Sequence, residues 1–285
     1  MNDGKQKLRL EVDGMWWKRI TISIGLFILG VVCFLTGVIW QTNLRLYTEH
    51  FRISTQNYLK AQLHIEAERT NVILNDQNIS AVSGKFTASR DFHLKKRETP
   101  NGSVIDIALQ FVKSLEQIPP GLYGKTNRAL VNVPTNLPVY LKVKNKSGTI
   151  TIDSLRSVPE AQLESASGNI WVSIPKHDVK TKYDIKTKTG NIYMDVPTQA
   201  RGDVQAVSEK GDISVRIPDT VPARITVIAK PGRSTVSAPI HSSQKNGFEY
   251  TEYVRHTSQQ GPVFTAMFQS LDGKVCVGER CAGYN

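Results

Sequence analysis

Apolar and polar residues alternate on both sides of a regularly spaced glycine through the middle of this chain. The positions seven and five before each glycine are apolar, and so are those two and four after it, with one serine as the exception. A period of two is the period of a β-strand, so each unit is predicted to be a strand, a tight turn and a second strand. The glycines are Gly148, Gly168, Gly190, Gly211 and Gly232, spaced by 20, 22, 21 and 21 residues.

The residues around each glycine fit this strand-turn-strand unit. Ser-Gly, Thr-Gly or Lys-Gly pairs are followed by Asn, Asp or Thr in most units. Glycine is expected there because a tight turn needs a positive φ angle, and Asn or Asp can brace the turn backbone. Proline ends the second strand in several units because it cannot donate to a β-ladder. These prolines are Pro175, Pro197, Pro218 and Pro239.

The repeat predicts an all-β fold, a β-solenoid with rungs of about 21 residues. A single unit cannot bury its apolar face, whereas stacked units bury it in continuous ladders. Residues 130–134 fit one unit upstream, with Asn127 in the place of the glycine, and Gly273 extends the repeat two units beyond Gly232. Residues 64–75 and 81–89 are interpreted as degenerate or capping rungs. The alternative is an antiparallel sandwich of short strands. The solenoid requires one column that contains Ile170, Ile192 and Ile213.

An uncharged stretch of 21 residues, Ile20–Trp40, precedes the repeat. As a helix it would be about 31 Å long, which matches the hydrocarbon core of a bilayer. No small-x-small cleavage site follows Trp40, so a transmembrane helix is favoured over a cleaved signal peptide. Five basic residues lie before the stretch and two lie shortly after it, which predicts a cytoplasmic N-terminus.

These features predict four parts of the chain. They are a cytoplasmic segment at 1–19, a transmembrane helix at 20–40, a juxtamembrane stalk at 41–61 and an extracytoplasmic β-solenoid at 62–285. Cys276 and Cys281 lie in the last part, where an oxidising compartment would allow a short disulfide loop. The alternative is two free thiols.

Lysines gather on two of the predicted strands, in a chain whose formal net charge is +11. Because they alternate with apolar residues, they are expected on the outer face of the solenoid. Lys142, Lys144, Lys186 and Lys188 are therefore the candidate surface-binding residues. Such a face would attract an anionic envelope polymer or lipid headgroups. The alternative is a solvated face that protects the strands, with Lys–Glu pairs between neighbouring rungs.

The sequence carries no motif for nucleotide binding, nucleophilic catalysis or metal ligation. The outward columns beside the glycines do not place two acids next to each other, as general acid–base hydrolysis of a polysaccharide would need. We therefore expect no catalytic residue, no cofactor and no metal. A nucleic-acid partner is not expected for a domain on the extracytoplasmic side of a membrane.

Four phrases around the glycines are similar to those of a known family. They are SGTITI, SGNIWV, TGNIYM and KGDISV, which begin at residues 147, 167, 189 and 210. Through them, residues 62–277 resemble the bacterial "putative adhesin" repeat family. The resemblance implies a β-solenoid behind one membrane anchor, and it implies no catalytic residues.

The combined prediction is a non-enzymatic, single-pass protein of the cell envelope. Its rigid solenoid would present a surface for adhesion or binding, to an anionic polymer, a lipid surface or a protein partner. Two alternatives stay open: a scaffold subunit of a membrane protein complex, and a carbohydrate-active β-helix enzyme.

Overall fold

The computed structural model describes residues 22–36, 46–88, 92–113, 127–176, 180–237, 241–255, 264–279 and 281. The chain divides into two compact units, Met1–Arg45 and Leu46–Asn285. In the first unit residues 22–36 form a helix with exposed side chains. The predicted membrane span, Ile20–Trp40, extends beyond the described residues at both ends. Within the described ranges, no helix has both the length and the apolar character needed to cross a membrane.

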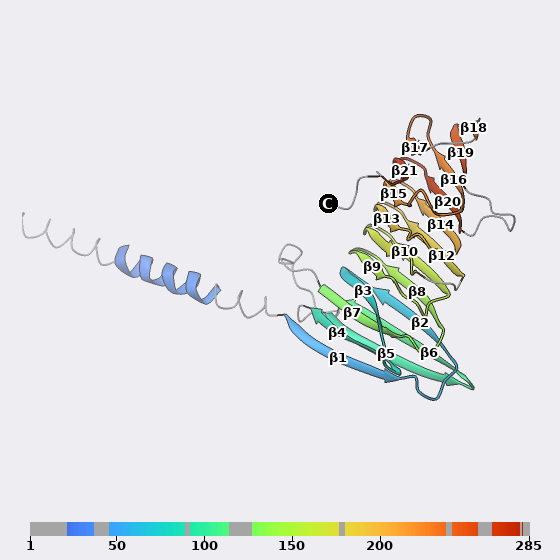
Figure 1. The fold of residues 1–285 in the computed structure, drawn as a ribbon. Coiled ribbons are helices and arrows are strands. Elements are labelled where there is room, and N and C mark those ends of the chain that lie inside the picture. Colours follow the sequence, from blue (N-terminus) through green and yellow to red (C-terminus); the bar gives the residue numbers. More distant parts are fainter. Residues whose placement is uncertain are drawn as a thin grey trace, which may run out of the picture. The chain divides into compact units, whose positions relative to one another are not determined.

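The second unit is built from two β-sheets that enclose one apolar core (Figure 1). Sheet I has ten strands among the described residues, in the spatial order β1-β4-β7-β3-β9-β11-β13-β15-β21-β17. Its strands are β1 (Tyr47–Ser54), β3 (Thr70–Gln77), β4 (Ala81–Ala88), β7 (Asn127–Pro134), β9 (Ile150–Asp153), β11 (Ile170–Ser173), β13 (Ile192–Asp195), β15 (Ile213–Arg216), β17 (Ser234–Val236) and β21 (Val275–Val277).

Sheet II has eleven strands in the same described ranges, in the spatial order β18-β19-β16-β20-β14-β12-β10-β8-β2-β6-β5. It holds the strand that precedes each repeat glycine, and sheet I holds the strand that follows it. The strands of sheet II are β2 (Lys60–Ala67), β5 (Phe92–Asn101), β6 (Val104–Lys113), β8 (Val139–Asn145), β10 (Glu160–Ser165), β12 (Thr181–Thr187), β14 (Gly202–Ser208), β16 (Ala223–Ala229), β18 (His241–Lys245), β19 (Phe248–Arg255) and β20 (Phe264–Ser270).

The repeats stack as parallel rungs, so the solenoid prediction is confirmed and the antiparallel sandwich is wrong for this part of the chain (Figure 1). In sheet I, Ile170 pairs with Ile150 on one side and with Ile192 on the other, and Ile192 pairs with Ile213. All four isoleucines are buried. Burying a side chain of this size contributes about 1.5–3 kcal/mol, so the column is a main source of stability.

The order of the rungs in space departs from their order in the chain at both ends of the repeat. After the rung of Gly211, the next rung in space is β20–β21 with Gly273, and the strands around Gly232 come after it. At the other end, β2–β3 lies next to β8–β9, so β7 is one rung further away. The prediction that Gly273 extends the repeat two units beyond Gly232 is therefore wrong, because its rung lies between those of Gly211 and Gly232.

Antiparallel strands cover both ends of the solenoid. Strands β1 and β4 extend sheet I beyond β7, and β5 extends sheet II beyond β6. At the other end β19 and β18 follow β16. The predicted stalk at 41–61 needs correction, because residues 47–54 form β1 and bury Phe51 and Ile53 in the core. Residues 41–45 of that stalk lie outside the described residues.

Glycine is required in the repeats mainly because neighbouring rungs approach closely. A Cβ atom added to Gly168 would lie 1.7 Å from the carbonyl oxygen of Gly148, and one added to Gly273 would lie 2.2 Å from that of Gly211. Of the five repeat glycines, only Gly148 and Gly232 have φ in the left-handed region. The prediction that the turn needs a glycine because of a positive φ is thus wrong for Gly168, Gly190 and Gly211. A Cβ on Gly232 would meet open space.

A buried polar side chain three residues before the glycine ties several rungs to the neighbouring one. Ser208 accepts a hydrogen bond from the N–H of Gly211 (2.8 Å) and donates one to the carbonyl of Gly190 (3.1 Å). The sequence analysis missed this column of Ser and Thr residues. It was interrupted at the Gly232 unit, which has Ala229 at the same position. The N–H of the following glycine donates in the same way to Ser165, Thr187 and Ser270.

A third column lies one residue after the glycine and also runs along the axis. The side-chain oxygen of Asn169 accepts the N–H of Asn191, whose side chain accepts the N–H of Asp212 (both 2.9 Å). Asp212 in turn accepts the N–H of Lys274 (2.7 Å), which belongs to the inserted rung. The Asn or Asp of the repeat phrase therefore bonds between rungs, in addition to any role within its own turn.

Candidate functional site

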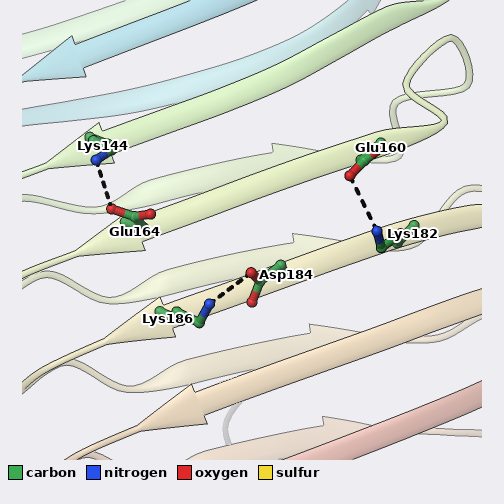
Figure 2. Close-up of polar contacts among 6 residues, drawn as sticks. All are labelled: Lys144, Glu160, Glu164, Lys182, Asp184 and Lys186. Carbon is green, nitrogen blue, oxygen red and sulfur yellow. Dashed lines mark hydrogen bonds and ion pairs between the residues drawn. The ribbon is translucent and has the colours of Figure 1, made fainter.

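The outer face of sheet II carries rows of charged side chains that run across the rungs. One row is Glu66, Lys144, Glu164 and Lys186, on four neighbouring strands in register. Figure 2 shows three ion pairs in this region. The Nζ–carboxylate distances are 3.2 Å for Lys144–Glu164, 3.5 Å for Lys182–Glu160 and 2.8 Å for Lys186–Asp184. The Lys–Glu alternation expected between rungs is therefore present, and exposed pairs of this kind contribute about 0–1 kcal/mol each.

Part of this face is hollowed into a groove of about 730 Å³, which we call the charged groove. It crosses the turn ends of β2, β8, β10, β12 and β14. Small apolar side chains contribute to its lining, namely those of Ala67, Val112, Ala166 and Val207. The charged side chains that line it are Glu66, Glu68, Lys144, Lys146, Glu164, Lys186, Lys188 and Glu209. Four lysines and four glutamates give a formal charge of zero, so the groove is mixed in charge and not uniformly basic.

The structure brings together three of the four lysines predicted as surface-binding residues. Lys144, Lys186 and Lys188 line the charged groove, whereas Lys142 lies in the next row outside it. In register, Lys142 has His64 and Gln162 as its neighbours. Within the described part of the chain, no ion pair involves Lys142 or Lys188.

The sequence analysis did not assign the other five charged residues that line the groove, which are Glu66, Glu68, Lys146, Glu164 and Glu209. The ammonium of Lys146 forms an ion pair with the Glu68 carboxylate, from a segment 78 residues away in the chain. Lys146 could have been found as the next outward lysine after Lys144. Glu68 could not, because it reaches the groove only through the insertion of β2 beside β8.

Two shifted pKa values accompany this face. The pKa of Lys186 is raised, because its ammonium donates a hydrogen bond to the Asp184 carboxylate and is attracted by that charge. Lys186 therefore stays protonated at neutral pH and keeps its pairing. Beneath the face, burial raises the pKa of the Tyr183 phenol, with a smaller effect from the charge of Asp76. Tyr183 is thus a neutral core residue and no part of the groove.

Cys276 and Cys281 are joined by a disulfide in the structure, with their Cα atoms 5.6 Å apart. Cys276 lies on β21, between Ser214 of β15 and Thr235 of β17. The bond therefore closes the chain directly after the inserted rung. It lies on sheet I and so is separate from the charged groove.

The described residues hold no cluster of three or more potential metal ligands. In the groove, the register places a lysine between Glu66 and Glu164, so these two acids are not direct neighbours. The arrangement can bind charged groups of both signs around an apolar patch.

The family model described as Toastrack DUF4097 matches residues 53–257, which is more than half of the chain. This match confirms the predicted resemblance to the "putative adhesin" repeat family. No curated protein sequence matches the chain.

Three solved structures of low sequence identity are similar to this chain, and the one with a TM-score above 0.5 shares its fold. A putative cell adhesion protein from Clostridium sporogenes is 13% identical, with a TM-score of 0.53 over 82% of this chain and 98% of its own. A putative adhesin from Bacteroides fragilis is 12% identical, with a TM-score of 0.38 over 82% and 97%. A putative lipid binding protein from Parabacteroides distasonis is 12% identical, with a TM-score of 0.32 over the same shares.

Proposed function

The chain belongs to the Toastrack DUF4097 family, and from this premise we propose that it is a non-enzymatic, adhesin-like protein of the cell envelope. It is held to the membrane by residues 20–40, with its N-terminus in the cytoplasm and its solenoid outside. It binds a protein partner through the charged groove. The observation that carries the proposal is the composition of this groove, small apolar side chains among four lysines and four glutamates.

Mixed charge favours a protein partner over a purely anionic polymer. Protein interfaces combine an apolar centre with a polar rim, and complementary charges fix their register. A polyanion in the groove would lie against Glu66, Glu68, Glu164 and Glu209 as well as against the lysines. An anionic polymer or a lipid surface is therefore the alternative that the experiment must separate.

The anchor is supported by the sequence of its helix. Residues 22–36 are helical and uncharged, and their large apolar side chains are exposed, Phe27 and Phe34 to 73% and 69%. Alkaline carbonate should leave the full chain in the membrane pellet, and protease added from outside should digest the solenoid. Release into the supernatant would refute the anchor without affecting the groove.

Two variants of the full chain separate the possible partners. The double variant Lys188→Glu/Glu209→Lys exchanges the signs of two groove residues on neighbouring rungs and leaves the net charge unchanged. A protein partner that reads the charge pattern should lose co-purification with it at least tenfold. A polyanion should bind the double variant as tightly as it binds wild type, because the net charge is the same. The quadruple variant Lys142→Gln/Lys144→Gln/Lys186→Gln/Lys188→Gln removes charge and should weaken binding to a polyanion.

The matched control exchanges an ion pair outside the groove. Arg224 and Glu252 lie on β16 and β19 with a nitrogen–oxygen distance of 3.8 Å, and Arg224→Glu/Glu252→Arg should co-purify the partner like wild type. Phosphatidylglycerol vesicles serve as the anionic probe. Vesicle binding that the quadruple variant loses and the groove exchange keeps, with no co-purifying protein, would refute the protein partner in favour of an anionic surface.

A further inference from the structure

Two rows of side chains run across the rungs within the charged groove. The first row, with one residue each from β2, β8, β10 and β12, is Glu66, Lys144, Glu164 and Lys186. The second row lies two residues further along the same segments and is Glu68, Lys146, Ala166 and Lys188. Figure 2 shows Lys144, Glu164 and Lys186 on neighbouring strands of this face. In the first row the sign of the charge changes from each strand to the next.

The order of charges in the first row is complementary to its own reverse. From β2 to β12 the row is acidic, basic, acidic, basic, and from β12 to β2 it is basic, acidic, basic, acidic. A second copy is turned over by a two-fold axis that runs parallel to the strands, midway between β8 and β10. Glu66 then lies opposite Lys186 of the second copy, and Lys144 lies opposite Glu164. Every charge of the row therefore meets an opposite charge, and such complementarity orients protein partners.

The second row fits the same axis in charge and in size. Glu68 lies opposite Lys188 of the second copy, and Lys146 lies opposite Ala166. Because Ala166 is exposed and its side chain is small, the methylene stem of Lys146 fills the groove there. Stacked sheets pack about 10 Å apart, which leaves room for a lysine and a glutamate side chain end to end.

The charge pattern also disfavours another two-fold arrangement of two such faces. An axis along the solenoid, midway between the two rows, would place each strand against itself. Lys144 would then meet Lys146 of the second copy, and Glu66 would meet Glu68. Like charges in direct opposition weaken an association, so the arrangement with reversed axes is favoured over this one.

The size of the face and the charges at its edge suit a contact between two copies. Six neighbouring strands of sheet II, from β6 to β14, span about 29 Å across the rungs and about 23 Å along the strands. The flat area is roughly 670 Å² per copy, against about 800 Å² of accessible surface in a standard interface. At the outer corner Asp106 comes opposite Asp203 of the second copy, whose charge is offset by its ion pair with Lys180 (2.8 Å).

We propose that the protein partner of the charged groove is a second copy of this chain, docked face to face on sheet II with its solenoid axis reversed. This inference rests on the proposed function, because it names the partner of the same groove. Each copy uses the same residues, so the contact is closed and joins two chains. In the pair, the β1 strands of the two copies lie at opposite ends.

Sedimentation of the full chain in a non-ionic detergent measures this association, and wild type should form a two-chain species. Lys144→Glu/Lys186→Glu makes the first row entirely acidic, and Glu66→Lys/Glu164→Lys makes it entirely basic. Each variant alone should associate at least tenfold more weakly than wild type. An equimolar mixture of the two variants should recover the two-chain species, because an acidic row then faces a basic row.

The matched control reverses two charges outside the contact. Arg224 and Lys245 are exposed on β16 and β18. Arg224→Glu/Lys245→Glu changes the net charge by the same amount as Lys144→Glu/Lys186→Glu and should associate like wild type. Circular dichroism and the thermal midpoint show whether each variant is folded. If a double variant does not fold, the single variants Lys144→Glu and Glu164→Lys provide a complementary pair.

A single-chain wild type, or a mixture of folded variants that stays single-chain, would overturn the second copy as the partner. A reversed variant that associates like wild type would do the same, since another surface would then hold the chains together. If wild type is single-chain while a photoreactive group at Ala166 captures a different protein, the proposed function stands without this inference. Capture of no protein at Ala166 by a single-chain wild type would refute the proposed function as well.

Discussion

At the scale of single residues, three polar or small positions set the repeat. Glycine allows two backbones to approach, the hydroxyl three residues earlier bonds the turn to the previous rung, and the following Asn or Asp bonds to the next one. Gly232 lacks the first two features, since a Cβ there meets open space and Ala229 replaces the hydroxyl. Gly273 has both features, a close approach to the Gly211 backbone and the hydroxyl of Ser270 three residues earlier.

Two glycine variants distinguish these roles. Gly273→Ala places a Cβ 2.2 Å from a backbone oxygen, so the free energy of unfolding should fall by more than about 3 kcal/mol. Gly232→Ala meets no atom but has a φ of 73°, which costs about 1–2 kcal/mol. Thermal and urea unfolding of both proteins measures the difference. If Gly232→Ala were the more damaging change, the units would follow chain order and the inserted rung would be wrong.

The hydroxyl column is tested at Ser208. Ser208→Ala leaves the N–H of Gly211 and the carbonyl of Gly190 without their buried partner, which should cost about 1–3 kcal/mol. Ser208→Thr keeps the hydroxyl, as Thr187 does one rung earlier, and should retain most of the stability. Ser243→Ala on the exposed strand β18 is the control, with an expected change within about 0.5 kcal/mol. Equal stability of Ser208→Ala and Ser208→Thr would contradict the role of the hydroxyl.

At the scale of elements, the inserted strands β20 and β21 join parts of the molecule that would otherwise be edges. Strand β20 pairs with β14 and β16, and β21 pairs with β15 and β17. Strands β14, β15 and β16 therefore depend on the last part of the chain for their second neighbour, and β17 depends on it for the one neighbour it has among the described strands. The Cys276–Cys281 disulfide lies directly at this junction, which suits a domain in an oxidising compartment.

Counting thiols tests the disulfide in protein purified from the native membrane. The chain has three cysteines, so alkylation of the denatured protein without reductant should modify Cys33 alone. After reduction, alkylation should modify all three. Three modified cysteines without reductant would show that the disulfide does not form and would weaken the extracytoplasmic assignment.

At the scale of the whole molecule, the periodic middle of the fold follows from sequence and its ends do not. The column of Ile170, Ile192 and Ile213 could be predicted because each unit repeats the same local pattern. The insertion of β2–β3 and β20–β21 could not be read from spacing, because pairing between distant segments leaves no local period. The hydroxyl at Ser270 was the available sign that Gly273 continues the ladder.

The same reason limits the prediction of the groove. Lys144, Lys186 and Lys188 could be placed on one outer face from the alternation of each strand. Glu66 lies on the inserted strand β2 and Glu68 directly follows it. Together with Glu164 and Glu209 they balance the charge of a face that was predicted to be basic. Across the molecule, the rungs thus bring together charges that the chain order separates.

The most direct test of a protein partner in the charged groove is photo-crosslinking in native membranes. A photoreactive amino acid at Ala166, an exposed residue that lines the groove, should capture one defined protein. The same group at Ser243 on β18 should not capture it. No protein adduct from Ala166, or the same adducts from both positions, would contradict the proposed role of the groove.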